Sequence, residues 1–336
     1  MPSTMRELRL YHRIRRQTVL GAGRGRLRPG GELPDMRIGS MFTGMGGLDL
    51  GIMQVFPDVT PAWHMEIEPG PAKVLSHHYP DVPNLGDVTK MDWQHAQPVD
   101  VITAGYPCQP FSTAGSRKGI HDPRHLWPHV HTAIRTLQPR FAVFENVLGH
   151  LTLGLDTVLA DLAEIGWDAE WETIRASDVG APHHRERLFI LAFPADSHGI
   201  GLKEKRLASR PAQAFTWDHD LFDTLAGISG AANIGHEIKM RWGQAAPRIL
   251  AWAMVTGHLP PLITEEVEAP SVHPRFPNIK AQSSAEMIEW LMGLQPGWVT
   301  QVAGLRRTQM IKMLGNGVVP LQAATAIREL MERLDT

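Results

Sequence analysis

Residues 38–51 read IGSMFTGMGGLDLG. An apolar run that ends near Phe42 predicts a buried strand, and the glycines at 44, 46 and 47 lead directly into a helix-like stretch. Glycines let backbone amides approach a ligand closely, and the start of a helix favours an anionic group. The spacing fits neither a Walker phosphate loop nor the dinucleotide pattern Gly-x-Gly-x-x-Gly. The stretch therefore predicts a strand, a ligand-binding turn and a helix, the opening unit of an α/β fold.

From Arg37 the chain continues this alternation of short apolar runs and helix-length amphipathic stretches. The alternation predicts a parallel sheet covered by helices on both faces. In such a sheet the ligand lies beyond the carboxyl ends of the strands, where the loops at Phe42, Glu66, Pro107 and Glu145 would converge. We expect strands near 37–42, 62–66, 99–104, 140–144 and 187–192, and helices near 47–55, 70–78, 127–137, 156–165 and 321–334.

The only cysteine lies in the segment GYPCQPFS, residues 105–112, directly after the apolar run 99–104. An isolated free cysteine is more often an inert core residue than a nucleophile. Here, however, Cys108 follows a strand end and lies between two prolines, which prevent regular structure around it. This position favours a role as a nucleophile.

Three further segments complete a recognisable set of motifs. They are ENV at 145–147, RER at 185–187 followed by the apolar run 188–192, and LGNGVVP at 314–320. Together with the glycine loop and the cysteine segment, and in this order, they resemble the motifs of the DNA cytosine-5 methyltransferases. The resemblance covers residues 37–193 and about 286–334.

The resemblance implies a Rossmann-like S-adenosylmethionine-dependent methyltransferase sheet with helices on both faces, plus a small target-recognition domain. The expected divisions are a basic flexible arm at 1–35, a catalytic and cofactor-binding domain at 36–195, a target-recognition domain at 196–285, and a C-terminal segment at 286–336 that returns to the catalytic domain. Trp217, Trp242 and Trp252 lie in the third region, and most of these aromatics are interpreted as a small core.

The resemblance also implies S-adenosylmethionine as the cofactor and S-adenosylhomocysteine as its product. Glu66, at the end of the second expected strand, could accept hydrogen bonds from ribose hydroxyls, and Asp87 could meet the adenine amino group. Without the flanking motifs, each carboxylate would be interpreted as a solvated loop residue. The expected cofactor-binding residues are Phe42, Thr43, Gly44, Met45, Gly46, Gly47, Leu48, Glu66, Ile67, Asp87, Val88, Pro107, Leu126, Asn316 and Val318.

The catalytic residues implied by the resemblance are Cys108, Glu145, Arg185 and Arg187. A thiolate that adds to carbon 6 of cytosine makes carbon 5 nucleophilic enough to accept a methyl group. Glu145 would act as the acid at ring nitrogen 3, because burial at a strand end raises a carboxyl pKa. Arg185 would bind the carbonyl oxygen at position 2, and Arg187 would buttress the site.

Attack on carbon 6 is blocked inside a stacked duplex, so the cytosine must be flipped out of the helix. The expected DNA contacts are Gln109 and Ser112 in the cysteine segment, with Arg117 and Lys118 in a mobile basic loop at 116–119 that could close over the base. Ser112 could equally serve ordinary turn chemistry. The expected partner is double-stranded DNA, with a cognate restriction endonuclease as a further candidate, and we expect a monomer.

Two departures from the family pattern keep alternatives open. His183 stands where the family commonly has glutamine, and the segment 283–294 lacks an arginine often found near its start. The leading hypothesis is a bacterial or phage enzyme that transfers a methyl group to cytosine carbon 5 in a specific duplex sequence, through a covalent Cys108 intermediate. The alternatives are a transfer-RNA cytosine-5 methyltransferase of the same family and a catalytically inactive DNA-binding relative.

Composition and charge add limits to these hypotheses. A single cysteine rules out an intramolecular disulfide, no apolar run is long enough for a membrane helix, and we expect a cytoplasmic protein. The formal charge is −2, so contacts to DNA must come from a local basic face. Residues 1–35 carry eight arginines against three acidic residues and could contact DNA phosphates. Because Met36 directly precedes the first strand, the favoured interpretation is that the arm is dispensable. We expect no metal, since prolines interrupt any helix that would align His121, His125 and His129.

Overall fold

The computed structural model describes residues 36–107, 126–196, 240, 242–261, 264–269 and 278–334 of the 336-residue chain. The expected N-terminal arm, 1–35, lies outside the described residues, and so does most of the stretch expected to hold target recognition. Within the described residues, no helix is long and apolar enough to cross a bilayer.

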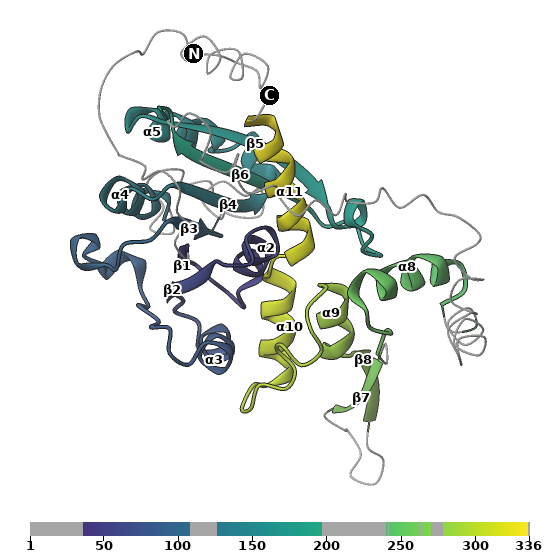
Figure 1. Ribbon diagram of the computed structural model, residues 1–336. Coiled ribbons are helices and arrows are strands. Elements are labelled where there is room, and N and C mark those ends of the chain that lie inside the picture. The colour runs from purple at the N-terminus through teal and green to yellow at the C-terminus, as the bar shows by residue number, and fades with distance from the viewer. Residues whose placement is uncertain are drawn as a thin grey trace.

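A six-stranded sheet forms the centre of the protein, with the strand order β2-β1-β3-β4-β6-β5 (Figure 1). Its apolar positions are nearly all buried, as in a sheet that is covered on both faces. The strands are β1 (Arg37–Met41), β2 (Thr60–Met65), β3 (Val101–Ala104), β4 (Phe141–Val147), β5 (Trp167–Arg175) and β6 (Glu186–Pro194).

The direction of β6 corrects the expectation of a fully parallel sheet. Strands β1 to β4 are parallel, but β6 runs antiparallel to β4 and to β5. Val147, the last residue of β4, therefore pairs with Arg187 near the start of β6. The reversal brings the amino end of β6 to the edge where β1, β3 and β4 end.

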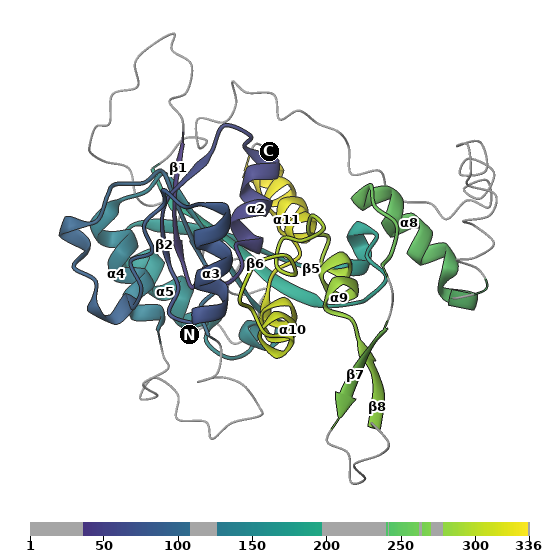
Figure 2. The ribbon, with the colours of Figure 1, turned by 90° about the horizontal axis from the view of Figure 1, so that it is seen from below.

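Helices cover both faces of the sheet, as expected (Figure 2). One apolar core, which includes Trp127 and Leu159, lies between the sheet and α4 (Trp127–Leu137) with α5 (Leu155–Glu164). A second core, which includes Ile52 and Ile327, lies under α2 (Gly47–Val55) and α11 (Pro320–Leu334). The helix α3 (Pro69–His78) follows β2.

A third core joins the middle of the chain to the C-terminal segment. It packs α8 (Ala246–Thr256) against α9 (Ala285–Leu291) and α10 (Arg307–Asn316). Trp252 is fully buried and donates from Nε1 to the carbonyl oxygen of Trp290 at 2.8 Å. For Trp252 the interpretation as a core residue is thus confirmed, while Trp217 lies outside the described residues.

A two-stranded antiparallel hairpin, β7 (Thr264–Ala269) with β8 (Asn278–Ser283), projects away from the main sheet (Figures 1 and 2). It leads directly into α9, whose cap residue Ser284 accepts a hydrogen bond from the Met287 amide at 3.0 Å. The helix α9 therefore begins directly after the hairpin. The expected boundaries of the target-recognition domain remain a prediction.

Candidate active site

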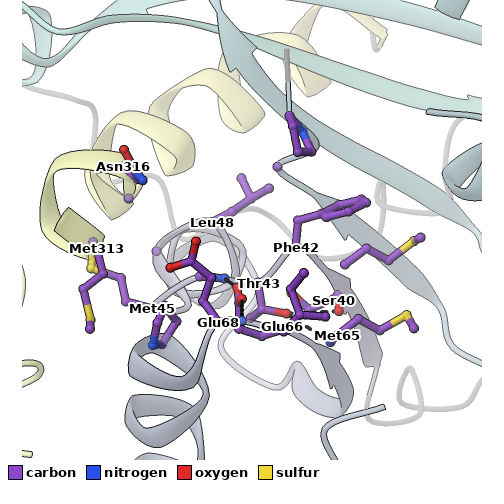
Figure 3. Close-up of a pocket in the computed structure, with 18 of the residues that line it drawn as sticks. Ser40, Phe42, Thr43, Met45, Leu48, Met65, Glu66, Glu68, Met313 and Asn316 are labelled. Atoms are coloured by element: carbon purple, nitrogen blue, oxygen red, sulfur yellow. Dashed lines mark hydrogen bonds between the residues drawn. The ribbon is translucent and has the colours of Figure 1, made fainter. Parts of the chain in front are cut away.

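A cavity of about 500 Å³ lies at the edge where β1, β3 and β4 end (Figure 3). The loops at Phe42, Glu66, Pro107 and Glu145 all line it, so their expected convergence is confirmed. Met313 and Asn316 of α10 face the cavity from the side opposite Phe42. Of the expected cofactor-binding residues, those in the cavity wall are Phe42, Thr43, Gly44, Met45, Gly47, Leu48, Glu66, Ile67, Asp87, Val88, Pro107, Leu126, Asn316 and Val318.

The glycine loop has the backbone geometry that its sequence predicts. Gly44 and Gly46 have φ values of 58° and 87°, in the left-handed region that glycine adopts without a steric penalty. A β-carbon on Gly47 would lie 2.3 Å from the carbonyl oxygen of Val318. Because Gly47 has no side chain, the C-terminal motif at 314–320 can pack against the first turn of α2. Gly46 directly precedes this turn and does not line the cavity.

Glu66 holds the glycine loop from the end of β2. Its Oε2 accepts a hydrogen bond from the Gly44 amide at 2.8 Å, and its Oε1 accepts one from the Glu68 amide at 2.7 Å. Burial raises the pKa of Glu66, and these amide donors act against the rise. Each carboxylate oxygen can accept a second hydrogen bond, so Glu66 can still receive hydroxyl donors from a ligand.

Asp87 is half-buried and caps the short 3₁₀ turn Val88–Lys90. Its Oδ1 accepts hydrogen bonds from the amide and the hydroxyl of Thr89 at 3.0 and 2.8 Å. These hydrogen bonds hold the pKa of Asp87 below its ordinary value. Beside it, Ile67 leaves 70% of its surface exposed, which makes an apolar wall available to a flat ligand.

Glu145 and Arg187 form an ion pair at the back of the cavity. Arg187 Nε lies 3.0 Å from Glu145 Oε1, and the Glu145 side chain is only 12% exposed. Burial raises the pKa of Glu145, and the charges of Arg187 and Arg185 partly offset the rise. A β-carbon on Gly105 would lie 3.8 Å from Glu145 Oε2, so the segment that leads to Cys108 starts beside this carboxyl.

Arg185 donates hydrogen bonds to the end of α10, and its expected contact to the base remains a prediction. Its φ of 24° turns the side chain toward α10, where Nη1 donates to the Gly315 carbonyl at 2.8 Å and Nη2 donates to the Gly317 carbonyl. Burial and the nearby Arg187 charge lower the pKa of Arg185 to about 10. The structure thus places Arg187, and not Arg185, on the acid.

His183, which replaces the family's glutamine, has a structural contact. Its Nε2 donates to the Leu291 carbonyl oxygen of α9 at 2.9 Å. Burial lowers the pKa of His183, so the neutral ring is favoured. This contact ties the arginine motif to the returning C-terminal segment in a way that an amide side chain could reproduce.

Several contacts around the cavity were not expected from the sequence. Lys312 Nζ lies 2.8 Å from a carboxylate oxygen of Glu68, which joins α10 to the start of α3 at the cavity wall. Trp298 Nε1 donates to the Met45 carbonyl at 2.9 Å, and its ring stacks on His78 at 3.7 Å. None of these three pairs has a sequence signal, because the members of each lie more than 200 residues apart.

Five expected site residues lie outside the described residues. They are the nucleophile and the four expected DNA contacts: Cys108, Gln109, Ser112, Arg117 and Lys118. Their roles therefore remain predictions from the sequence. The described residues on either side of the gap, Pro107 and Leu126, both line the cavity.

Known proteins share both the sequence and the fold. The sequence pattern of the C-5 cytosine-specific DNA methylases matches residues 36–238. The type II methyltransferase M.CviJI of Paramecium bursaria Chlorella virus IL3A is 34% identical over 54% of this chain and 48% of its own length. M.NlaX of Neisseria lactamica is 33% identical over 47% of this chain and 52% of its own length, so the chain spans about half of each relative.

Solved structures agree on the fold. The Dnmt2 methyltransferase of S. pombe aligns over 90% of this chain and 100% of its own, with a TM-score of 0.58 at 16% identity. The methyltransferase EhMeth of Entamoeba histolytica aligns over 90% of this chain, also with a TM-score of 0.58. The glycine loop, the buried acid with its arginine and the matched sequence pattern agree, and the chain belongs to the C-5 cytosine-specific DNA methylase family.

Proposed function

We propose that the protein is a DNA cytosine-5 methyltransferase that acts on a flipped-out cytosine in a specific duplex sequence. The observation that carries the proposal is the buried pair of Glu145 and Arg187, 3.0 Å apart, beside the start of the cysteine segment. A carboxyl and a guanidinium side by side match two neighbouring hydrogen-bonding positions on one edge of cytosine, ring nitrogen 3 and the carbonyl oxygen on carbon 2.

The cavity residues fit S-adenosylmethionine. The cavity volume of about 500 Å³ lies within the range of about 300–1,000 Å³ that small-molecule sites occupy. Amides at the start of α2 suit the methionine carboxylate, Glu66 suits the ribose hydroxyls, and Ile67 with Asp87 suits the adenine ring and its amino group. When bound, S-adenosylmethionine supplies the methyl group that carbon 5 of cytosine receives.

The protein residues then have the following roles. The Cys108 thiolate adds to carbon 6, and the electron pair of the ring double bond moves toward carbon 5. In its protonated form, which burial favours by raising its pKa, Glu145 donates a hydrogen bond to nitrogen 3 and neutralises the charge that develops there. Loss of the carbon 5 proton and cleavage of the bond between sulfur and carbon 6 restore the ring.

The division of roles between the two arginines follows their contacts. Arg187 binds Glu145 through Nε and donates from Nη1 to the Glu186 carbonyl at 2.8 Å, so its guanidinium edge lies next to the acid. We therefore assign the contact to the cytosine carbonyl oxygen to Arg187. Arg185, which donates to the carbonyl oxygens of Gly315 and Gly317, supports the end of α10 that carries Asn316.

Covalent trapping tests this proposal. A duplex that carries 5-fluorocytosine in the target sequence cannot lose its carbon 5 substituent as a proton, so the enzyme remains attached through sulfur. We expect a stable adduct with the wild type in the presence of the cofactor, and none with Cys108→Ala. An adduct on a fluorinated transfer RNA but not on duplex DNA would show that transfer RNA is the substrate in place of duplex DNA. Binding of duplex DNA without any adduct would support a catalytically inactive relative.

A further inference from the structure

Two buried residues outside the cavity form a hydrogen bond next to the cysteine segment. The Tyr106 hydroxyl lies 2.9 Å from His150 Nε2, and the two residues are 4% and 2% exposed. Tyr106 stands two positions before Cys108, and His150 lies in the 3₁₀ turn Leu148–Leu151 that follows β4. The bond therefore joins the nucleophile segment to the turn after the proposed acid.

The direction of this bond follows from the second nitrogen of the imidazole. His150 Nδ1 lies 3.1 Å from the Leu153 carbonyl oxygen, which can only accept a hydrogen bond. Nδ1 must therefore carry a proton, and in the neutral ring Nε2 is left as the acceptor. Tyr106 consequently donates its hydroxyl hydrogen to His150.

The main chain of Tyr106 is held from the same side. Asn146, which follows the proposed acid Glu145, donates from Nδ2 to the Tyr106 carbonyl oxygen at 3.2 Å. Asn146 is itself fixed, because its Oδ1 accepts a hydrogen bond from the Val147 amide at 2.9 Å. The Tyr106 ring packs edge-on against Phe144, with ring centres 6.2 Å apart.

We propose that His150, acting through Tyr106, positions the cysteine segment relative to Glu145. Tyr106 stands two positions before Cys108, and two residues of extended chain span at most roughly 7 Å, so the Cα atoms of the two residues cannot lie farther apart than that. This inference rests on the proposed function for its kinetic consequence, but not for the contact itself. Neither Tyr106 nor His150 lines the cavity, so both are positioning residues.

The first arm of the test is kinetic. Tyr106→Phe keeps the ring and removes the hydroxyl, and we expect about a tenfold lower rate of adduct formation in a single turnover. The affinity for S-adenosylmethionine and the KM for DNA should not change. Tyr79→Phe is the matched control, because the Tyr79 hydroxyl donates to the Met53 sulfur, at 3.9 Å, and makes no contact with the cysteine segment among the described residues.

The conservative replacement of His150 separates positioning from stability. His150→Gln offers an oxygen acceptor near the place of Nε2, whereas His150→Leu offers none. We expect His150→Gln to form the adduct at most of the wild-type rate and His150→Leu to form it as slowly as Tyr106→Phe. Each rate is corrected for any loss of folded protein, so that differences in resistance to unfolding do not account for the result. Equal rates for all variants and the wild type would overturn the inference.

The second arm does not depend on activity. Because the chain has one cysteine, a trifluoromethyl tag attached through sulfur reports only on position 108. We expect Tyr106→Phe to shift or narrow its fluorine resonance and Tyr79→Phe to leave it unchanged. An unchanged resonance in Tyr106→Phe overturns the positioning role. If Tyr106→Phe shifts the resonance as expected but the wild-type protein forms no adduct, only the proposed function is overturned.

Discussion

At the scale of single residues, burial and charge decide what Glu145 does. The carboxyl is nearly buried, which raises its pKa, and it lies against the Arg187 guanidinium, which lowers it. A carboxyl whose pKa is subject to these two opposing influences can donate a proton and accept it again. In the proposed mechanism, the same pair also fixes the direction from which the cytosine ring approaches.

Glu145→Gln should lose activity without losing the fold. The amide is isosteric and can still donate a hydrogen bond to nitrogen 3, but it cannot transfer a proton. We expect kcat to fall about 100- to 10,000-fold, as for the loss of a general acid, with S-adenosylmethionine affinity unchanged. Glu172→Gln, at a pair with Arg333, is the matched control and should keep wild-type kcat. A Glu145→Gln enzyme with more than a tenth of wild-type kcat would contradict the assignment.

Asp49 provides a test of stability against pH. It is buried, and its Oδ1 accepts a hydrogen bond from the Thr103 hydroxyl at 2.6 Å. Burial raises the pKa of Asp49 to about 6, while in an unfolded chain an aspartate titrates near about 3.9. The folded state thus binds the proton more tightly, and this stabilising contribution is full below pH of about 4 and lost as the pH rises to about 6.

Asp49→Asn removes this titration and keeps an acceptor for Thr103. We expect the variant to exceed the wild type in free energy of unfolding at pH 8 by up to about 3 kcal/mol, and to lose that advantage near pH 4. Urea unfolding at the two pH values measures the difference. The same difference between the two proteins at both pH values would show that Asp49 does not titrate in this range.

At the scale of elements, α2 and α11 approach each other through a glycine. A β-carbon on Gly51 would lie 2.6 Å from the Ala323 β-carbon and 2.9 Å from the Pro320 carbonyl oxygen. We expect Gly51→Ala to destabilise the protein by about 1–3 kcal/mol through overpacking, although alanine favours a helix more than glycine does. Gly149→Ala, where no atom lies within 4 Å of the added carbon, should change stability little. Equal stability of the two variants would argue against this close packing.

The elements could be predicted where local signals mark their ends. The observed bounds of α2 and α4 are those expected, since Gly46 precedes one helix and Pro128 lies in the first turn of the other. The strand β5 was missed, although Trp167, Ala169 and Trp171 alternate with acidic residues and are buried. The helix α10 has a weaker pattern, because it buries only Met313 and Leu314.

At the scale of the whole molecule, the position of the cavity could be predicted, but the partners of the arginines could not. The carboxyl ends of parallel strands meet at one edge whatever the register, so the loops at Phe42, Glu66 and Glu145 converge. The contacts of Arg185 and Arg187 depend instead on the antiparallel direction of β6 and on the φ of Arg185. Neither can be read from the order of motifs along the chain.

Residues 1–35 are expected to contribute nothing essential to DNA binding. The side chain of Met36, which directly follows the arm, is buried in the core under α2 and α11. We expect a variant that starts at Met36 to bind a target duplex with unchanged affinity and an unchanged slope of log affinity against log salt. Each lost arginine contact to a phosphate would reduce that slope by about one, so a smaller slope would assign the arm a role.

The central claim is that this protein methylates carbon 5 of cytosine in one DNA sequence through Cys108. Its most direct test is expression in a bacterial host without cytosine methylation, followed by bisulfite sequencing of the genome, beside Cys108→Ala. We expect protected cytosines in a single recurring sequence with the wild type and none with the variant. A wild-type protein that is folded and abundant, yet leaves every cytosine convertible, would contradict the claim.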